Sequence, residues 1–171
     1  MFNATLNYEG LVSMKLVGPD GQVKQSFEQK HNLVTAAGLR HSLKRMLGDS
    51  TATLTSLNVT GGTENEAVDA PIGYVGIGQG STAPSSNDTA LQTPFSNSRV
   101  AFSNITLDST GTSVVYKATF APGVGTGPVQ EAGLFTAETG GVMTNRVVFA
   151  VINKGEQDSL ECQWRLNVVN N

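Results

Sequence analysis

The sequence predicts a mainly β protein, a β-sandwich or flattened barrel of about eight antiparallel strands with one short amphipathic helix. Short stretches of alternating apolar and polar residues are separated by clusters of Gly, Pro, Asn and Asp, which is typical of strands joined by turns. Apolar residues at helical spacing occur in one segment only, so the alternation of strands and helices of a Rossmann-like fold is missing. We expect residues 1–171 to form a single β-rich domain.

The first two strands are expected to form a hairpin. Residues 6–17 end in an alternation that places Val12, Met14 and Leu16 on one face of a strand. The turn formers of residues 18–21 (GPDG) follow, and residues 23–27 continue as the return strand. Residues 1–9 are a candidate N-terminal arm that reaches a neighbouring subunit.

The one predicted helix lies within residues 32–48. Thr35 is the expected N-cap and Gly48 the expected C-terminal stop. We expect one apolar stripe of the helix to pack onto the sheet. This stripe consists of Leu39, Leu43, Met46 and Leu47.

The remainder of the chain combines one exposed excursion with six further strands. Residues 49–71 are rich in Thr, Asn and Gly and are interpreted as a surface excursion with at most one short strand, at residues 54–59. The six strands are expected at residues 73–78, 100–107, 113–120, 129–135, 142–151 and 160–169.

Charge and hydropathy exclude several classes of partner. The net charge is −3 and the Lys and Arg residues are mostly scattered, whereas a nucleic-acid partner requires a basic stripe. No apolar run approaches the roughly 18 residues of a membrane span, so no membrane partner is expected. The first residues lack the features of a secretory signal, which predicts synthesis in a cytoplasm. Only 15% of residues are charged, against about 25% in typical proteins, which suits faces covered by other subunits.

The residues needed for hydrolytic or thiol chemistry lack their usual context. His31 and His41 are the only imidazoles, and Ser42 lacks the G-x-S-x-G context of an activated nucleophile. Cys162 has no neighbouring base in the sequence and is expected to be a small buried apolar residue. Paired carboxylates of the glycosidase type meet only in three dimensions, and nothing in the sequence favours them. We therefore predict that the protein is not an enzyme and has no catalytic residues.

Glycine-rich and acidic segments do not match known phosphate or metal motifs. Residues 73–81 have the spacing G-x-x-G-x-G-x-G and do not open a helix, so we interpret them as a strand edge with a close backbone turn. Residues 123–128 are a loop between two strands by the same reasoning. Glu64, Glu66 and Asp69 lack the calcium-loop pattern and are interpreted as part of a solvated loop. We expect no cofactor and no metal.

One charged residue does require an explanation. Glu131 lies in an otherwise apolar strand, where a buried carboxylate needs a cationic partner. Glu131 is therefore our candidate for a structural ion pair that holds the sheet or an interface. Arg99, Arg146 and Arg165 are the available partners, and Lys154 is expected to mark a strand end.

Four segments, taken in order, resemble small virion proteins of tailed bacteriophages, a group that includes tail-collar and tail-fibre proteins and other components of the particle surface. They are residues 32–39 (NLVTAAGL), 74–84 (YVGIGQGSTAP), 88–91 (DTAL) and 130–135 (QEAGLF). The resemblance implies a β-rich subunit in a symmetric particle, located in the virion and made in a bacterial host. Its implied partners are copies of itself and other virion proteins (tail, fibre, portal or neck, or major capsid protein), and it implies no catalytic residues.

Three functions remain open at this stage. The first is a tail- or neck-associated adaptor or collar protein for fibres or neighbouring subunits, and the second is a capsid decoration (cement) protein. The third is a carbohydrate-binding module, which requires an exposed aromatic platform. Trp164 is the only tryptophan, and aromatic residues make up 6% of the chain.

Overall fold

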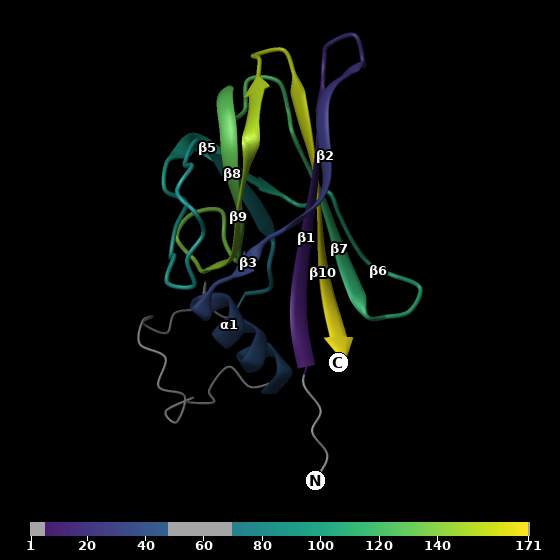
Figure 1. Cartoon of the computed structure of the whole chain (residues 1–171), viewed down its shortest axis with the longest axis vertical. Helices are drawn as coiled ribbons and strands as arrows, with labels where there is room; N and C mark the ends of the chain where they lie inside the picture. The colour runs from purple at the N-terminus through teal and green to yellow at the C-terminus, as the bar shows by residue number, and fades with distance from the viewer. Residues whose placement is uncertain (1–5, 48–69, 171) are drawn as a thin grey trace.

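The computed structural model describes residues 6–47 and 70–170, which form an open sandwich of two five-stranded antiparallel sheets with one short helix (Figure 1). The predicted mainly β sandwich is confirmed, whereas the alternative of a flattened barrel is wrong because the sheets do not close. The described residues contain ten strands rather than about eight. In chain order the elements are β1 (Leu6–Val17), β2 (Val23–His31), β3 (Leu33–Val34), α1 (Ala36–Leu47), β4 (Tyr74–Gly78), β5 (Pro94–Ala101), β6 (Asn104–Leu107), β7 (Ser113–Phe120), β8 (Gly127–Phe135), β9 (Met143–Lys154) and β10 (Ser159–Asn170).

Each sheet collects strands from distant parts of the chain. The first sheet has the order β2-β1-β10-β7-β6, and the second has the order β3-β9-β8-β4-β5. The predicted hairpin of β1 and β2 is present, and its turn uses Gly21 at a φ of 77°, which glycine adopts without strain. β1 pairs with β10 along its whole length, from Leu6 opposite Asn170 to Val17 opposite Ser159. The start of β1 and the end of β10 therefore lie at the same end of the sandwich (Figure 1).

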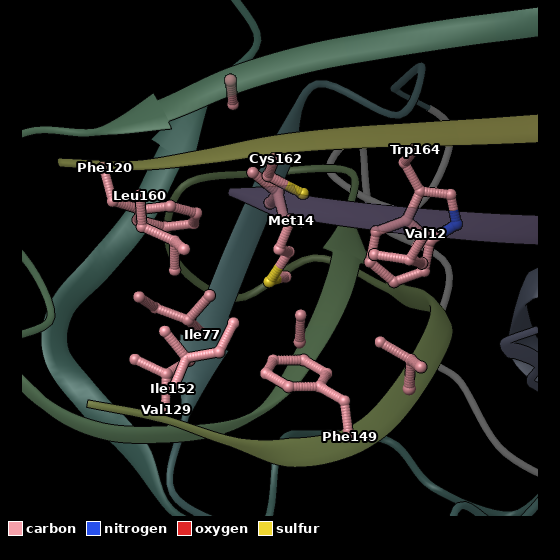
Figure 2. Packing of buried hydrophobic residues seen from close by; sticks show 14 of the residues in the cluster. Val12, Met14, Ile77, Phe120, Val129, Phe149, Ile152, Leu160, Cys162 and Trp164 are labelled. Carbon is pink, nitrogen blue, oxygen red and sulfur yellow. The ribbon is translucent and has the colours of Figure 1, made fainter. Parts of the chain in front are cut away.

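The core fills the space between the inner faces of the two sheets (Figure 2). The alternation of β1 places Val12, Met14 and Leu16 in it, as the sequence predicts. Phe120 and Trp164 are fully buried beside them, and β8 and β9 contribute the opposing layer. The outer face of the second sheet, on the other side from this core, carries the buried residues Glu131 of β8 and Arg146 of β9.

The segment predicted as one strand at residues 100–107 is in fact two strands in different sheets. β5 ends at Ala101 and β6 begins at Asn104. The amide of Phe102 donates to the carbonyl of Gly73, next to the second sheet, and the amide of Ser103 donates to Lys117 in the first sheet. The chain therefore crosses between the sheets within two residues, and only the pairing of β5 and β6 with different partners reveals this change.

The helix begins where predicted but presents a different face to the sheet. Thr35 caps α1 through its hydroxyl, which accepts a hydrogen bond from the amide of Gly38 at 2.9 Å. Gly38 lies against the backbone of Thr144 on β9, so closely that a Cβ at this position would collide with the Thr144 carbonyl. Leu39 and Leu43 are 48% and 42% exposed, so the predicted apolar stripe does not pack onto the sheet at these positions. Close approach of the backbones, rather than the leucine pattern, sets the orientation.

Several predicted features fall wholly or partly outside the described residues. The excursion at residues 49–71 overlaps them only at residues 70 and 71, and the short strand at 54–59 and the acidic residues Glu64, Glu66 and Asp69 lie outside them. Of the N-terminal arm predicted at residues 1–9, residues 6–9 belong to β1 and pair with β10, so the prediction is wrong for that part. No helix among residues 6–47 and 70–170 is long and apolar enough to cross a membrane.

Candidate functional site

A buried ion pair lies on the outer face of the second sheet. Glu131 on β8 is opposite Val148 and Arg146 on β9 is opposite Gly133, so the two charged residues are diagonal neighbours on adjacent strands. Both side chains are fully buried. Arg146 Nη2 lies 2.9 Å from Glu131 Oε2, and Arg146 Nε donates to the same oxygen at 3.0 Å. Of the three arginines considered from the sequence, Arg146 is the partner.

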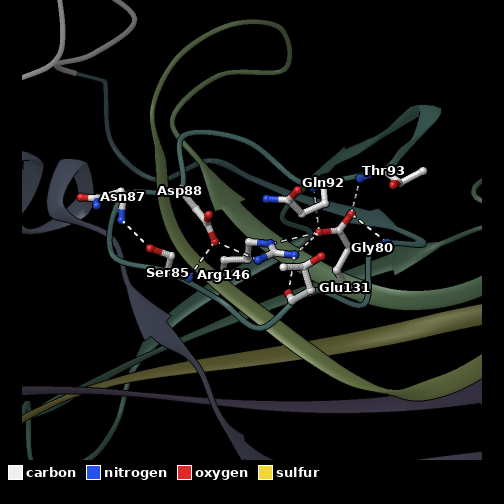
Figure 3. Close-up of polar contacts among 9 residues, drawn as sticks. Gly80, Ser85, Asn87, Asp88, Gln92, Thr93, Glu131 and Arg146 are labelled. Atoms are coloured by element: carbon white, nitrogen blue, oxygen red, sulfur yellow. Dashed lines mark hydrogen bonds and ion pairs between the residues drawn. The ribbon is translucent and has the colours of Figure 1, made fainter.

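The Glu131 carboxylate is saturated with hydrogen bonds (Figure 3). Its Oε1 accepts from the amides of Gly80 at 3.1 Å and Thr93 at 2.7 Å, and its Oε2 accepts from the amide of Gln92 at 3.0 Å in addition to Arg146. A buried carboxylate is tolerated when cations and amides compensate its lost hydration. These donors, all of them protein groups, engage both oxygens of the carboxylate.

Arg146 extends the network to a third residue. Its Nη1 donates to Asp88 Oδ2 at 2.8 Å, and its Nη2 also donates to the carbonyl of Thr82 at 3.1 Å. Asp88 Oδ2 in turn accepts from the amide of Ser85 at 2.9 Å, which closes a tight turn. We call Asp88, Glu131 and Arg146 the buried clamp.

The buried clamp fixes residues 79–93, which contain no strand or helix and which we call the clamped loop. Both ends of this loop bind Glu131, through Gly80 at one end and Gln92 and Thr93 at the other. Leu91 of the loop is buried against Phe135 and Met143, in a small apolar cluster separate from the main core. The loop therefore forms a third layer over the outer face of the second sheet. It covers the Glu131–Arg146 ion pair and contributes the buried side chain of Leu91.

The glycine spacing noted in the sequence has a steric explanation here. A Cβ on Gly78 or Gly80 would lie 2.6 Å from Glu131 Oε1, closer than real side chains approach. The glycines therefore make room for the carboxylate and allow the backbone to donate to it. The close backbone approach expected for residues 73–81 agrees with this geometry. The expectation of a strand edge is wrong, because β4 pairs with β8 on one side and with β5 on the other.

The other two arginines have separate roles. Arg99 stacks on the ring of Phe135, with its guanidinium carbon 3.6 Å from the ring centroid, and donates to the carbonyls of Ala137 and Gly140. Partial burial lowers the pKa of Arg99 from its ordinary value. Arg165 is on β10 of the first sheet, and its Nη1 lies 3.8 Å from Oδ2 of Asp108, which follows β6. Lys154 ends β9 as expected, and its Nζ donates to the carbonyl of Ala121 at 3.0 Å.

The residues considered for catalysis are not gathered into a reactive site. His31 is exposed and lies 3.3 Å from Glu9, whereas His41 is buried on α1. Cys162 is buried in the main core, and its burial raises the pKa of the thiol to about 12, far from the range of a reactive thiolate. Within the described ranges, no group of three or more His, Cys, Asp or Glu side chains could hold a metal ion.

Asp88 and the clamped loop were not identified as parts of this site from the sequence. Glu131 is recognisable in the sequence because it is a charge in an apolar strand, whereas Asp88 lies in a polar loop, where carboxylates are common. The glycines of residues 74–84 were the available signal for this contact, because a glycine is needed where another group packs directly against the backbone. No protein-family model, curated protein or solved structure matches this chain.

Proposed function

We propose that this protein is a structural subunit of a tailed-bacteriophage particle, a tail- or neck-associated adaptor or collar protein to which fibres or neighbouring subunits attach. The observation that carries the proposal is the convergence of the four resembling segments on one scaffold. Gly80, Asp88 and Glu131, each from a different segment, belong to one hydrogen-bonded network, and Ala36 of the fourth donates its amide to Ser86 in the clamped loop.

This convergence supports a shared architecture rather than a shared reaction. The residues of the buried clamp hold the clamped loop in place. Proteins that share a fold differ in function through the surfaces that the fold presents. In this chain, the segments that resemble phage virion proteins supply the buried clamp and its contacts with the clamped loop. The resemblance and the geometry therefore favour the same class of function.

The clamped loop is the proposed contact surface for neighbouring virion proteins. Its exposed side chains are uncharged, and its one charged residue, Asp88, is turned inward to Arg146. A loop fixed before binding loses little conformational entropy when a partner covers it. The exposed side chains include Gln79, Ser81, Thr82, Ser85, Ser86, Asn87, Thr89, Gln92 and Thr93.

The carbohydrate-binding alternative has lost its main candidate residue. Trp164 lies on β10 opposite Val12 and is fully buried in the main core, so it cannot form an aromatic platform for a sugar. The capsid decoration alternative requires the same adhesive chemistry as an adaptor and differs from it in copy number. Symmetry gives an adaptor about a dozen copies in a closed ring, and a decoration protein hundreds over the shell.

The test is the copy number of this protein in purified particles, measured by quantitative mass spectrometry against the portal and major capsid proteins. A count near a dozen supports the adaptor or collar, and a count in the hundreds replaces it with the decoration protein. Absence from particles rejects the structural role.

A pair of variants tests the contact surface separately. Thr89→Arg places a charge on the exposed clamped loop, and Thr139→Arg places the same charge in the exposed turn between β8 and β9. We expect Thr89→Arg to lower incorporation into particles relative to Thr139→Arg, at equal folded stability. Equal incorporation of the two variants rules out the clamped loop as the contact.

A further inference from the structure

The outer edge of β6 differs from the other sheet edges in its lack of protection against pairing. Exposed strand edges present unpaired main-chain groups and are usually blunted by charges, proline, bulges or extreme shortness. β2 carries Lys24, Glu28 and Lys30 and a register shift, β5 begins with Pro94 and has a register shift against β4, and β3 has two residues. β6 has the sequence Asn-Ile-Thr-Leu, with no charge and no proline.

The side chains of β6 are unusually apolar for their exposure. Ile105 is 53% exposed and Leu107 is 68% exposed. They lie opposite Tyr116 and Val114 of β7, on the face of the first sheet that carries the core. Within residues 6–47 and 70–170, β6 pairs only with β7, so its other edge has no strand beside it (Figure 1).

The register of β6 identifies which main-chain groups point outward. The amide of Asp108 donates to Ser113 on the β7 side, and main-chain groups alternate in direction along an antiparallel strand. Thr106 therefore directs its N–H and C=O toward β7, whereas Ile105 and Leu107 direct theirs away from it. These two residues thus combine free main-chain groups with exposed apolar side chains.

We propose that β6 pairs with β6 of a second copy of this chain, antiparallel about a two-fold axis at Thr106, so that the two first sheets join into one. In this register Ile105 of each copy lies opposite Leu107 of the other, in two pairs that each exchange two main-chain hydrogen bonds. Thr106 faces its own equivalent across the axis, and Asn104 faces Asp108. No like charges are opposed, and all four exposed apolar side chains lie on one face.

The size of this contact predicts its strength. Two four-residue strands bury much less than the roughly 1,200 Å² of a stable interface. We therefore expect weak self-association of the isolated protein, which gains strength when other contacts hold copies close together. The inference rests on the proposed function only for the expectation that copies meet in an assembly, and purified protein tests it without particles.

Cysteine cross-linking tests both the partner and the register. Thr106 residues that face each other in a non-hydrogen-bonded pair have Cα atoms about 4.5 Å apart, within disulfide range. Asn104→Cys is the matched control, because Asn104 is exposed on the same strand and face but lies far from its equivalent in this register. The native Cys162 is buried and does not compete.

We expect a disulfide-linked dimer as the main oxidation product of Thr106→Cys and a minor product of Asn104→Cys. Sedimentation equilibrium of the unoxidised protein should show self-association that Leu107→Lys abolishes and Val23→Lys preserves, since Val23 is 52% exposed on the opposite edge strand. Equal cross-linking of both cysteine variants, or a monomer at all concentrations with no Thr106→Cys dimer, would overturn the β6 pairing. Neither result would affect a copy number measured in particles.

Discussion

Arg146 directs both Nε and Nη2 to a single oxygen of Glu131, and its remaining Nη1 reaches Asp88 in a loop 58 residues earlier in the chain. This geometry joins two strands of the second sheet to a loop that has no regular structure of its own. The buried clamp is therefore the link between the sandwich and the proposed contact surface. Its removal should affect the loop more than the sheets.

The first prediction concerns the stability supplied by the buried clamp. Glu131→Ala leaves the buried Arg146 with Asp88 as its one remaining carboxylate partner in the buried clamp, and breaking a buried ion pair costs about 3–5 kcal/mol of unfolding free energy. Glu161→Ala is the matched control, because its ion pair with Lys15 is half exposed and contributes about 0–1 kcal/mol. Chemical denaturation of both variants measures the difference. Similar losses in the two variants would contradict the structural role of Glu131.

The second prediction concerns the contact between α1 and β9. Alanine in place of glycine inside a helix ordinarily stabilises it by about 1 kcal/mol. Gly38→Ala should instead destabilise the protein, because its Cβ would collide with the Thr144 backbone, which cannot rotate away. Gly73→Ala is the control, since the nearest atom to its added Cβ is 3.8 Å away. Thermal unfolding should show a lower Tm for Gly38→Ala than for Gly73→Ala. The reverse order would contradict the close contact between Gly38 of α1 and Thr144 of β9.

The third prediction concerns acid stability. The pKa of Asp158 is lowered from 3.8, first by the hydrogen bond from Lys24 and next by that from the Gly155 amide. A carboxyl whose pKa is lower in the folded state contributes stability that is complete above its unfolded pKa and is lost as the pH falls through the folded one. Asp158→Asn should therefore weaken the pH dependence of unfolding below about pH 4. Unfolding midpoints at pH 7 and pH 3 measure this, with Asp20→Asn, an exposed turn residue, as the control.

The fourth prediction concerns the single thiol. Burial raises the pKa of Cys162 to about 12, so the thiol is protonated and shielded in the folded protein. Ellman's reagent at pH 8 should react with Cys162 only as fast as the protein unfolds, and at once in denaturant. Rapid labelling of the native protein would show that β10 opens locally. The same measurement can report the stability of the Glu131 variants.

Local sequence was sufficient to predict much of this fold. The alternation at Val12, Met14 and Leu16 identified β1 and its buried face because side chains of a strand alternate between two sides. The N-cap at Thr35 and the turn at Gly21 were predictable for a similar reason, since each depends on one residue and its near neighbours. The need of Glu131 for a partner was also predictable, because burying a carboxylate is costly whichever group compensates it.

Other features were decided by the tertiary structure. Arg99, Arg146 and Arg165 were equivalent partners for Glu131 in the sequence, and only the register of β8 and β9 brought Arg146 within reach. The orientation of α1 followed the close approach of Gly38 to Thr144 and not the leucine pattern. The crossing at Phe102 divided one predicted strand between two sheets. The short-range sequence pattern thus determined which segments are strands and which residues need a partner. Pairing between segments far apart in the chain decided which partner each residue contacts, because those contacts depend on the register and layering of the whole fold.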